Sequence, residues 1–188
     1  MSDAKGINVL AICGSLRTGS YNRAALRTAI ELGPPGMTIE TADIAAFPLY
    51  NEDVRAQGFP PPVETLRRQI AAADALLFVT PEYNRSVPGG LKNALDVGSR
   101  PYGKSWFLGK PVGIISNSPG ALGGVSAAKH LQNILPGIAR PILGQPEIYL
   151  NGIGDAFDDK GQLTKEAVQK VLQQYIDAFA AFIEKQNG

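Results

Sequence analysis

Short apolar runs alternate with longer stretches of helical periodicity along almost the whole chain. Five such runs occur, at Ile7–Cys13, Met37–Asp43, Ala75–Thr80, Val112–Ser116 and Ile142–Leu150. Continuous apolar runs are typical of strands that are buried on both faces, as in parallel sheets. The second run alternates with polar residues and the fifth contains Gly144 and Pro146, so we expect both nearer the sheet edges. Strands that alternate with helices predict an α/β doubly wound domain.

Helical patterns fill the intervals between these runs. They cover Asn22–Glu31, Val63–Ala73, Gly89–Ser99, Ser126–Leu135 and the segment that follows Thr164. In that last segment apolar residues recur at helical spacing, namely Val168, Val171, Leu172, Tyr175, Ile176, Phe179 and Ile183. We predict Thr164 as the N-cap of this helix. No repeat or linker interrupts the pattern, so residues 1–188 are expected to form a single domain.

One connection, Pro48–Pro62, is too long and too polar for an ordinary link between two elements. Loops of this length within a compact domain are often functional or lie at an interface. A plain surface excursion is the alternative reading of this segment.

Composition excludes several classes of protein. Apolar residues make up 44% of the chain and the net charge is only +1, which excludes intrinsic disorder and disfavours nucleic-acid binding. A single cysteine, Cys13, and a single histidine, His130, exclude an internal disulfide and any metal centre rich in cysteine or histidine. The first apolar run is too short for a membrane span and lacks signal-peptide features, so we expect a soluble cytoplasmic protein. The chemistry is then expected to come from a bound group.

The loop after the first apolar run, Gly14–Arg23, has the composition of a phosphate site. It leads into a helix N-terminus, and its neutral donors are Ser15, Thr18, Ser20 and Asn22. Arg17 and Arg23 add cations, and residues 4–30 contain no carboxylate. The dinucleotide-binding pattern G-x-G-x-x-G is absent, and Ser20 stands where a Walker A motif needs lysine. The expected ligand is therefore a phosphomonoester. A helix start capped by serine, with incidental arginines, is the alternative.

Two further loops follow the third and fourth apolar runs. In Pro81–Gly90, Tyr83 offers a ring for a planar ligand, and Asn84 offers both a donor and an acceptor. The glycines of Asn117–Gly124 allow the backbone to approach a ligand closely. Because ligands of open parallel sheets bind beyond the carboxyl ends of the strands, the three loops predict one site. A proline-stiffened turn with a surface tyrosine is the alternative for the second loop.

Three motifs in these loops, GSLRTGSYNR, PEYNRSVPGGLKNALD and SPGALGG, resemble the NAD(P)H-dependent FMN reductase family. The resemblance extends from Ile7 to the final helix. It implies a flavodoxin-like fold with a five-stranded parallel sheet in the order 2-1-3-4-5, flanked by helices. It also implies noncovalent FMN, NADPH or NADH as co-substrate, and a homodimer with the flavin near the subunit interface, sometimes paired into a tetramer.

The resemblance assigns the cofactor contacts to residues of the three loops. The first loop is expected to hold the FMN phosphate, the second to follow the isoalloxazine edge, partly through backbone groups, and the third to lie on the far side of the ring. The expected cofactor-binding residues are Ser15, Arg17, Thr18, Ser20, Asn22, Pro81, Glu82, Tyr83, Asn84, Arg85, Ser118 and Gly120. The Pro48–Pro62 loop is expected to help form the dimer interface.

Some relatives differ at positions near the second and third loops. They place an aromatic residue at the position of Arg85. They also place an arginine and a tyrosine at the positions of Ser126 and Lys129, which pair with Glu147 across a tetramer contact. Glu147 is present here, but these partners are not.

The implied reaction is a ping-pong hydride transfer from NAD(P)H to FMN, followed by two-electron reduction of quinones, flavins, chromate, azo compounds or similar acceptors. FMN carries this chemistry, so no catalytic side chain and no metal is expected. Arg85 is a candidate contact for the phosphates of the nicotinamide cofactor. His130 is expected on a helix surface, and Cys13 as a small buried apolar residue. A flavodoxin-type electron carrier without NAD(P)H turnover is the alternative, although such carriers are generally strongly acidic.

Overall fold

The computed structural model describes residues 6–187, and its centre is a parallel β-sheet. The strands are β1 Ile7–Cys13, β2 Met37–Ala42, β3 Ala75–Thr80, β4 Leu108–Asn117, β5 Arg140–Ile142 and β6 Ile148–Leu150. Their order is β2-β1-β3-β4-β5, and β6 also pairs with β4. The predicted α/β class and strand order are therefore confirmed. Strand β3 is buried at every residue, as expected for a strand with a neighbour on each side and helices on both faces.

The fifth predicted strand is two short strands, so its prediction as one run is wrong. Both β5 and β6 pair in parallel with β4, which has ten residues and is long enough to accept the two in succession. The break falls between Ile142 and Ile148, where Gly144 and Pro146 stand. Proline has no N–H to donate to a sheet, so pairing with β4 stops there and resumes beyond it.

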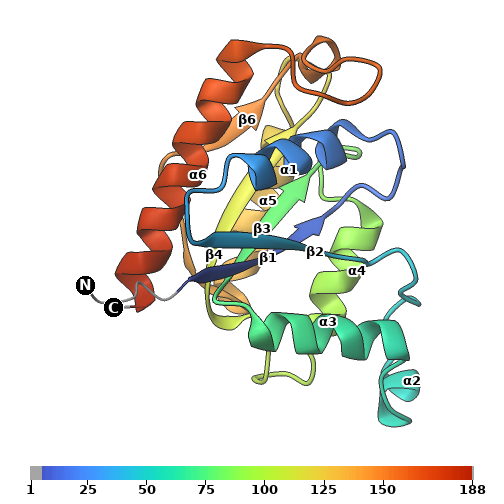
Figure 1. Ribbon diagram of the computed structural model, residues 1–188. Coiled ribbons are helices and arrows are strands. Elements are labelled where there is room, and N and C mark those ends of the chain that lie inside the picture. Colours follow the sequence, from blue (N-terminus) through green and yellow to red (C-terminus); the bar gives the residue numbers. More distant parts are fainter. Residues whose placement is uncertain (1–5, 188) are drawn as a thin grey trace.

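Six α-helices flank the sheet in the described part of the chain. They are α1 Tyr21–Glu31, α2 Glu52–Ala56, α3 Pro61–Ala72, α4 Gly89–Gly98, α5 Val125–Ile134 and α6 Glu166–Asn187. One hydrophobic core joins α1 and α6 to one face of the sheet, and a second joins α3, α4 and α5 to the other face. Figure 1 shows α1 and α6 together on one side and α3 and α4 on the other.

Helix α6 differs from its prediction at its start and at one position of its apolar face. The helix begins at Glu166, and Thr164 is not its N-cap. Instead the Thr164 hydroxyl donates to the carbonyl of Ala156 at 3.1 Å, which fastens the preceding loop. Val171 is exposed, whereas Leu172 and the other apolar residues that follow it on the face are buried. The apolar face that contacts the sheet is therefore narrower than the periodicity suggested.

The Pro48–Pro62 segment is not a loop throughout. It contains α2, whose N-cap Asn51 accepts from the N–H of Asp53 at 2.8 Å, and α3 already begins at Pro61. Proline is well suited to a first helical turn, because its missing N–H would have no partner there. Within residues 6–187, no helix is both long enough and apolar enough to cross a membrane.

Candidate functional site

The three loops predicted to form one site, Gly14–Arg23, Pro81–Gly90 and Asn117–Gly124, lie at one edge of the sheet. Strands β1, β3 and β4 are neighbours and run parallel, so the segments that follow Cys13, Thr80 and Asn117 leave the sheet at the same end. In Figure 1 the chain passes from these strand ends into α1, α4 and α5. The structure thus brings together the residues that the sequence assigned to one site.

The first loop holds its polar side chains close to the start of α1. Ser20 is the N-cap of α1, and its hydroxyl accepts from the N–H of Asn22 at 3.1 Å. Arg23 donates through Nε to the carbonyl of Ser15 at 3.3 Å, which closes the loop on itself. The Arg17 guanidinium lies over the Tyr21 ring, 5.9 Å from its centroid. Ser15, Ser20 and Asn22 are buried, whereas Arg17 and Thr18 are exposed.

The positive charge of the first loop is not neutralised by ion pairs among residues 6–187, because no carboxylate there pairs with Arg17 or Arg23. The N–H groups at the start of α1 add a partial positive charge at the same place. The loop therefore suits an anionic group better than a neutral one.

Buried amides without partners lie at the same edge of the sheet. Oδ1 of Asn22, and both Oδ1 and Nδ2 of Asn117, are buried and have no hydrogen-bond partner. Asn117 ends β4 and is fully buried. An unpaired buried polar group costs on the order of 1–3 kcal/mol, so such groups need a ligand or ordered water as a partner. Their position indicates a site that is completed by a polar molecule.

The second loop contains a tight turn in an unusual backbone conformation. Tyr83 and Ser86 exchange two backbone hydrogen bonds, of 2.9 and 3.0 Å, and enclose Asn84 and Arg85. Both enclosed residues have positive φ, 51° and 65°. Asparagine tolerates this region, but arginine adopts it at a cost. Strain of this kind clusters at functional sites, and here it presents an exposed Tyr83 ring at the rim.

Glu82 has a different role from its neighbours in the second loop. Its Oε2 accepts from the N–H groups of Ser126 at 2.9 Å and Ala127 at 3.4 Å. Both N–H groups belong to the first turn of α5. The carboxylate is therefore directed at α5, and only the backbone of Glu82 remains for the expected contact with a ring edge. Pro81, which precedes it, is buried.

The third loop is shaped by glycines with positive φ. A Cβ on Gly123, at φ 58°, would lie 2.7 Å from the carbonyl carbon of Tyr149, so no larger residue fits. The Ser116 hydroxyl donates to the Gly123 carbonyl at 2.8 Å, and the Ser118 hydroxyl accepts from the N–H of Gly120 at 3.1 Å. Ser118 and Gly120 are thus held in a compact turn beside the other two loops.

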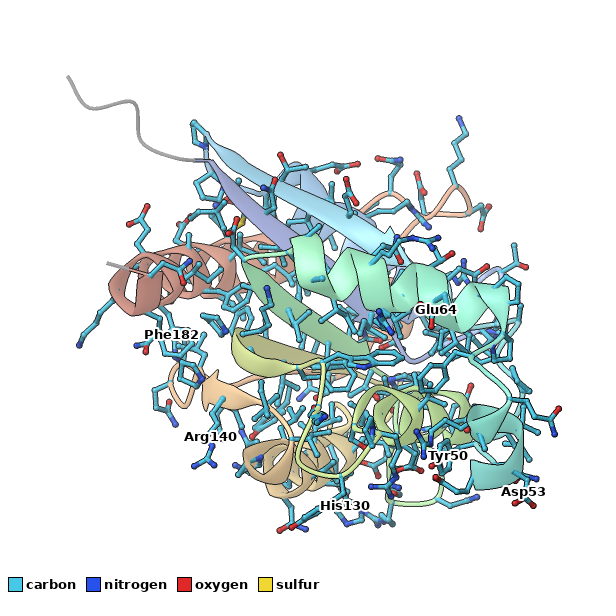
Figure 2. The ribbon with its side chains drawn as sticks, turned by 90° about the horizontal axis from the view of Figure 1, so that it is seen from below. Tyr50, Asp53, Glu64, His130, Arg140 and Phe182 are labelled. Carbon is cyan, nitrogen blue, oxygen red and sulfur yellow. The ribbon has the colours of Figure 1, made fainter. Side chains whose placement is uncertain are left out.

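Two features of this region were not found from the sequence. Asn117 was placed at the start of the third loop but not among the binding residues, although a polar residue that closes an apolar strand was a usable signal. The second is a hydrogen bond of 2.9 Å between Ser86 Oγ and His130 Nδ1. His130 lies on the surface of α5 as expected (Figure 2), but no local pattern indicates that α5 lies against the second loop.

The Pro48–Pro62 segment is fastened next to the site through α4. The Asn93 side chain donates to the carbonyl of Pro48 at 2.9 Å and accepts from the N–H of Tyr50 at 2.8 Å. The Tyr50 hydroxyl and Arg55 both donate to Glu52, and these bonds, that of Arg55 first, lower the pKa of Glu52 to about 2. Figure 2 shows Tyr50 and Asp53 at the surface around α2.

Glu147 has its partners within the chain. Lys129 donates to the Glu147 carboxylate, and Gln132 donates to it at 2.8 Å. These bonds, that of Lys129 first, lower the pKa of Glu147 to about 2. The Lys129 ammonium also lies 5.8 Å from the centroid of the Tyr149 ring. The Glu147 carboxylate is thus already paired with Lys129 within the chain.

Comparisons with known proteins identify the relatives of this chain. The family model described as NADPH-dependent FMN reductase matches residues 7–155. An NAD(P)H-dependent FMN reductase of Pseudomonas aeruginosa is 50% identical over 188 residues, which are all of both chains. A quinone reductase of Pseudomonas putida is 45% identical over 94% of this chain and 95% of its own. The solved structure of the flavoenzyme FerB, an NAD(P)H:(acceptor) oxidoreductase from Paracoccus denitrificans, is 37% identical with a TM-score of 0.88, covering 96% and 98% of the two chains.

Proposed function

This chain belongs to the NADPH-dependent FMN reductase family and is an oxidoreductase that uses FMN and NAD(P)H, and from this premise we propose that its three loops hold FMN and that its acceptor is a quinone. The observation that carries the proposal is the meeting of a carboxylate-free cationic loop with buried, unpartnered amides at one sheet edge. We propose that residues 1–188 form one FMN-binding domain. The cytoplasmic location of the protein remains a prediction.

The residues at this edge fit FMN in charge and in hydrogen-bonding capacity. The phosphate finds the N-terminus of α1, the hydroxyls of the first loop and the guanidinium of Arg17. Asn22 Oδ1 and both polar atoms of the Asn117 amide lack partners, and the hydroxyl groups of FMN can serve them as donors and acceptors. The exposed ring of Tyr83 offers a flat surface to an aromatic ring system.

Bound FMN supplies the hydride and electron transfer, so the tasks of the chain are binding and orientation. Ser15, Arg17, Ser20 and Asn22 would hold the phosphate end. Backbone N–H groups of the second and third loops would lie along the ring, where they would stabilise negative charge that develops on reduction. Reduction of a quinone would take a hydride and a proton, and because the site is open, solvent would supply the proton and no side chain would have to donate it.

Quinones are the proposed acceptor class because the Pseudomonas putida relative is named a quinone reductase. A flat, exposed site suits a flat acceptor, and Tyr83 is half exposed at its rim. Arg85 projects from the same turn and is proposed to contact the phosphates of the nicotinamide cofactor.

We propose a homodimer formed through the Pro48–Pro62 segment. Apolar side chains are exposed there and in the nearby loop after α4, with Leu49 at 82% and Tyr102 at 93% exposure. Large apolar groups so exposed are typical of a surface that is covered in an assembly. Because Glu147 already binds Lys129 and Gln132, the tetramer contact of some relatives is not part of the proposal.

An anaerobic absorbance experiment tests the function. Purified protein, supplied with FMN and desalted, is expected to be yellow. Its flavin band should bleach on addition of NADPH or NADH and return on addition of a benzoquinone. A colourless protein that does not retain FMN would contradict the assignment, and a yellow protein that neither nucleotide bleaches would favour the electron carrier.

A further inference from the structure

Two side-chain contacts join the second loop to helix α5. Oε2 of Glu82 accepts from the N–H groups of Ser126 and Ala127, and Ser86 Oγ is hydrogen-bonded to His130 Nδ1. His130 follows Ser126 by four residues and Ala127 by three, which is about one turn of a helix. Both contacts therefore lie along one side of α5. The loop that bears Tyr83 is therefore attached to a helix 44 residues further along the chain.

Helix α5 cannot cap its own N-terminus. Its N-cap is Gly124, which has φ 81° and no side chain to accept a hydrogen bond. A Cβ at this position would also lie 3.2 Å from the Cβ of Ser116, so a capping serine or aspartate is disfavoured. A carboxylate forms charge-assisted hydrogen bonds with the N–H groups of a helix N-terminus, and Glu82 supplies one from another loop.

The turn between the two contacts needs external support. Asn84 and Arg85 both have positive φ, and the residues from Tyr83 to Arg85 are exposed. A strained two-residue turn at the surface persists only where its surroundings fix both of its ends. Glu82 immediately precedes this turn, and Ser86 closes it.

We propose that Glu82 is a positioning residue for the flavin. Its carboxylate, together with the Ser86–His130 contact, forms a clamp that holds the turn Tyr83–Ser86 against α5, and the Glu82 side chain acts through this helix without itself contacting the ring. The inference rests on the proposed function, in which this turn follows the isoalloxazine edge. The affinity and orientation of FMN would then depend partly on the contact between the Glu82 carboxylate and α5, which does not touch the cofactor.

Two variants of the full chain, Glu82→Ala and Glu82→Gln, test the clamp with and without FMN. Backbone hydrogen exchange of Ser126 and Ala127 is measured in flavin-free protein, and FMN affinity by fluorescence quenching. Glu82→Ala is expected to speed exchange at both amides, and to weaken FMN binding by about tenfold because the turn along the ring loses one of its two attachments to α5. It should also change the circular dichroism of the bound flavin. Glu82→Gln keeps an acceptor oxygen and should restore part of each property.

Variants at the other contact separate the two halves of the clamp. Ser86→Ala and His130→Ala should each weaken FMN binding without faster exchange at Ser126 and Ala127. Glu147→Gln is the matched control, because this carboxylate also binds α5 but through Lys129 and Gln132, away from the turn. It should leave FMN affinity and both amides unchanged.

Four results would overturn the clamp. If Glu82→Ala weakens FMN binding while Ser126 and Ala127 keep their protection, Glu82 contacts the flavin directly. If protection is lost and FMN affinity and flavin dichroism stay unchanged, Glu82 only stabilises α5. Should the wild-type chain itself fail to bind FMN, the proposed function fails with the clamp. A wild type that binds FMN, beside a Glu82→Ala variant that binds it equally well, removes the clamp alone.

Discussion

The two arginines of the first loop differ in the contacts that they make within the protein. Arg23 donates to the carbonyl of Ser15 and so helps to shape the loop. Arg17 lies over the Tyr21 ring and pairs with no carboxylate of residues 6–187. A guanidinium without an anionic partner, beside a helix N-terminus, retains its full capacity for a phosphate. Arg17 is therefore the side chain where the phosphate assignment is tested most directly.

Replacing Arg17 by alanine is expected to weaken FMN binding by about ten- to a hundredfold, as loss of a charged hydrogen-bond donor to phosphate does. Fluorescence titration of flavin-free protein measures the dissociation constant. Arg27→Ala is the control, because Arg27 lies within α1, beyond the loop, and donates to the carbonyl of Gly161 at 3.4 Å. Equal affinities of the wild type and the Arg17 variant would refute the role given to this residue.

At the scale of elements, α6 and β4 are joined by one buried polar contact. The N–H of Ile114 in β4 donates to the Tyr175 hydroxyl at 2.6 Å. Tyr175 is 2% exposed, and burial raises its pKa above the ordinary value of about 10. The phenol thus has to stay neutral for α6 to stay on the sheet.

Tyr175→Phe is expected to lower the free energy of unfolding by about 1–3 kcal/mol at pH 7, because the Ile114 N–H loses its partner while the ring remains. Urea unfolding followed by circular dichroism measures this loss. A pKa raised in the folded state also has a consequence at high pH. The stability that it contributes is complete below about pH 10 and is lost as the pH rises above that value. The wild type should therefore weaken more steeply above pH 10 than the variant, and parallel pH profiles would contradict this reading.

At the scale of the whole molecule, the exposed apolar groups near α2 and after α4 form the surface through which we propose that two copies associate. Leu49→Asp combined with Tyr102→Asp is expected to convert this proposed dimer to a monomer, since burying two carboxylates in an apolar contact is strongly unfavourable. Sedimentation equilibrium measures the mass. Val171→Asp serves as a comparison at a different exposed apolar residue, which lies on α6. A wild type that sediments as a monomer, or a double variant that remains dimeric, would show that the interface lies elsewhere.

The positions of the strands could be predicted because the burial of a strand determines the polarity of its own consecutive residues. Strands covered on both faces have to be apolar at consecutive residues, and β1 and β3 have the bounds that their apolar runs predict. The fifth run failed because the same apolar content also fits two short strands on one long neighbour, β4. Thr164 failed because a hydroxyl near a helix start can equally well bind a carbonyl elsewhere, here that of Ala156.

The sequence by itself determined the class of fold, the three loops and the dependence on a bound group, since one cysteine and one histidine leave few other routes to chemistry. Parallel pairing of apolar strands places all three loops at one edge, which follows from the pattern alone. Only the tertiary structure decided that Glu82 caps α5, that Ser86 meets His130 and that Asn117 is buried without a partner. Periodicity records how far a residue is buried, but its partner depends on how distant segments pack, and that packing exists only in the folded chain.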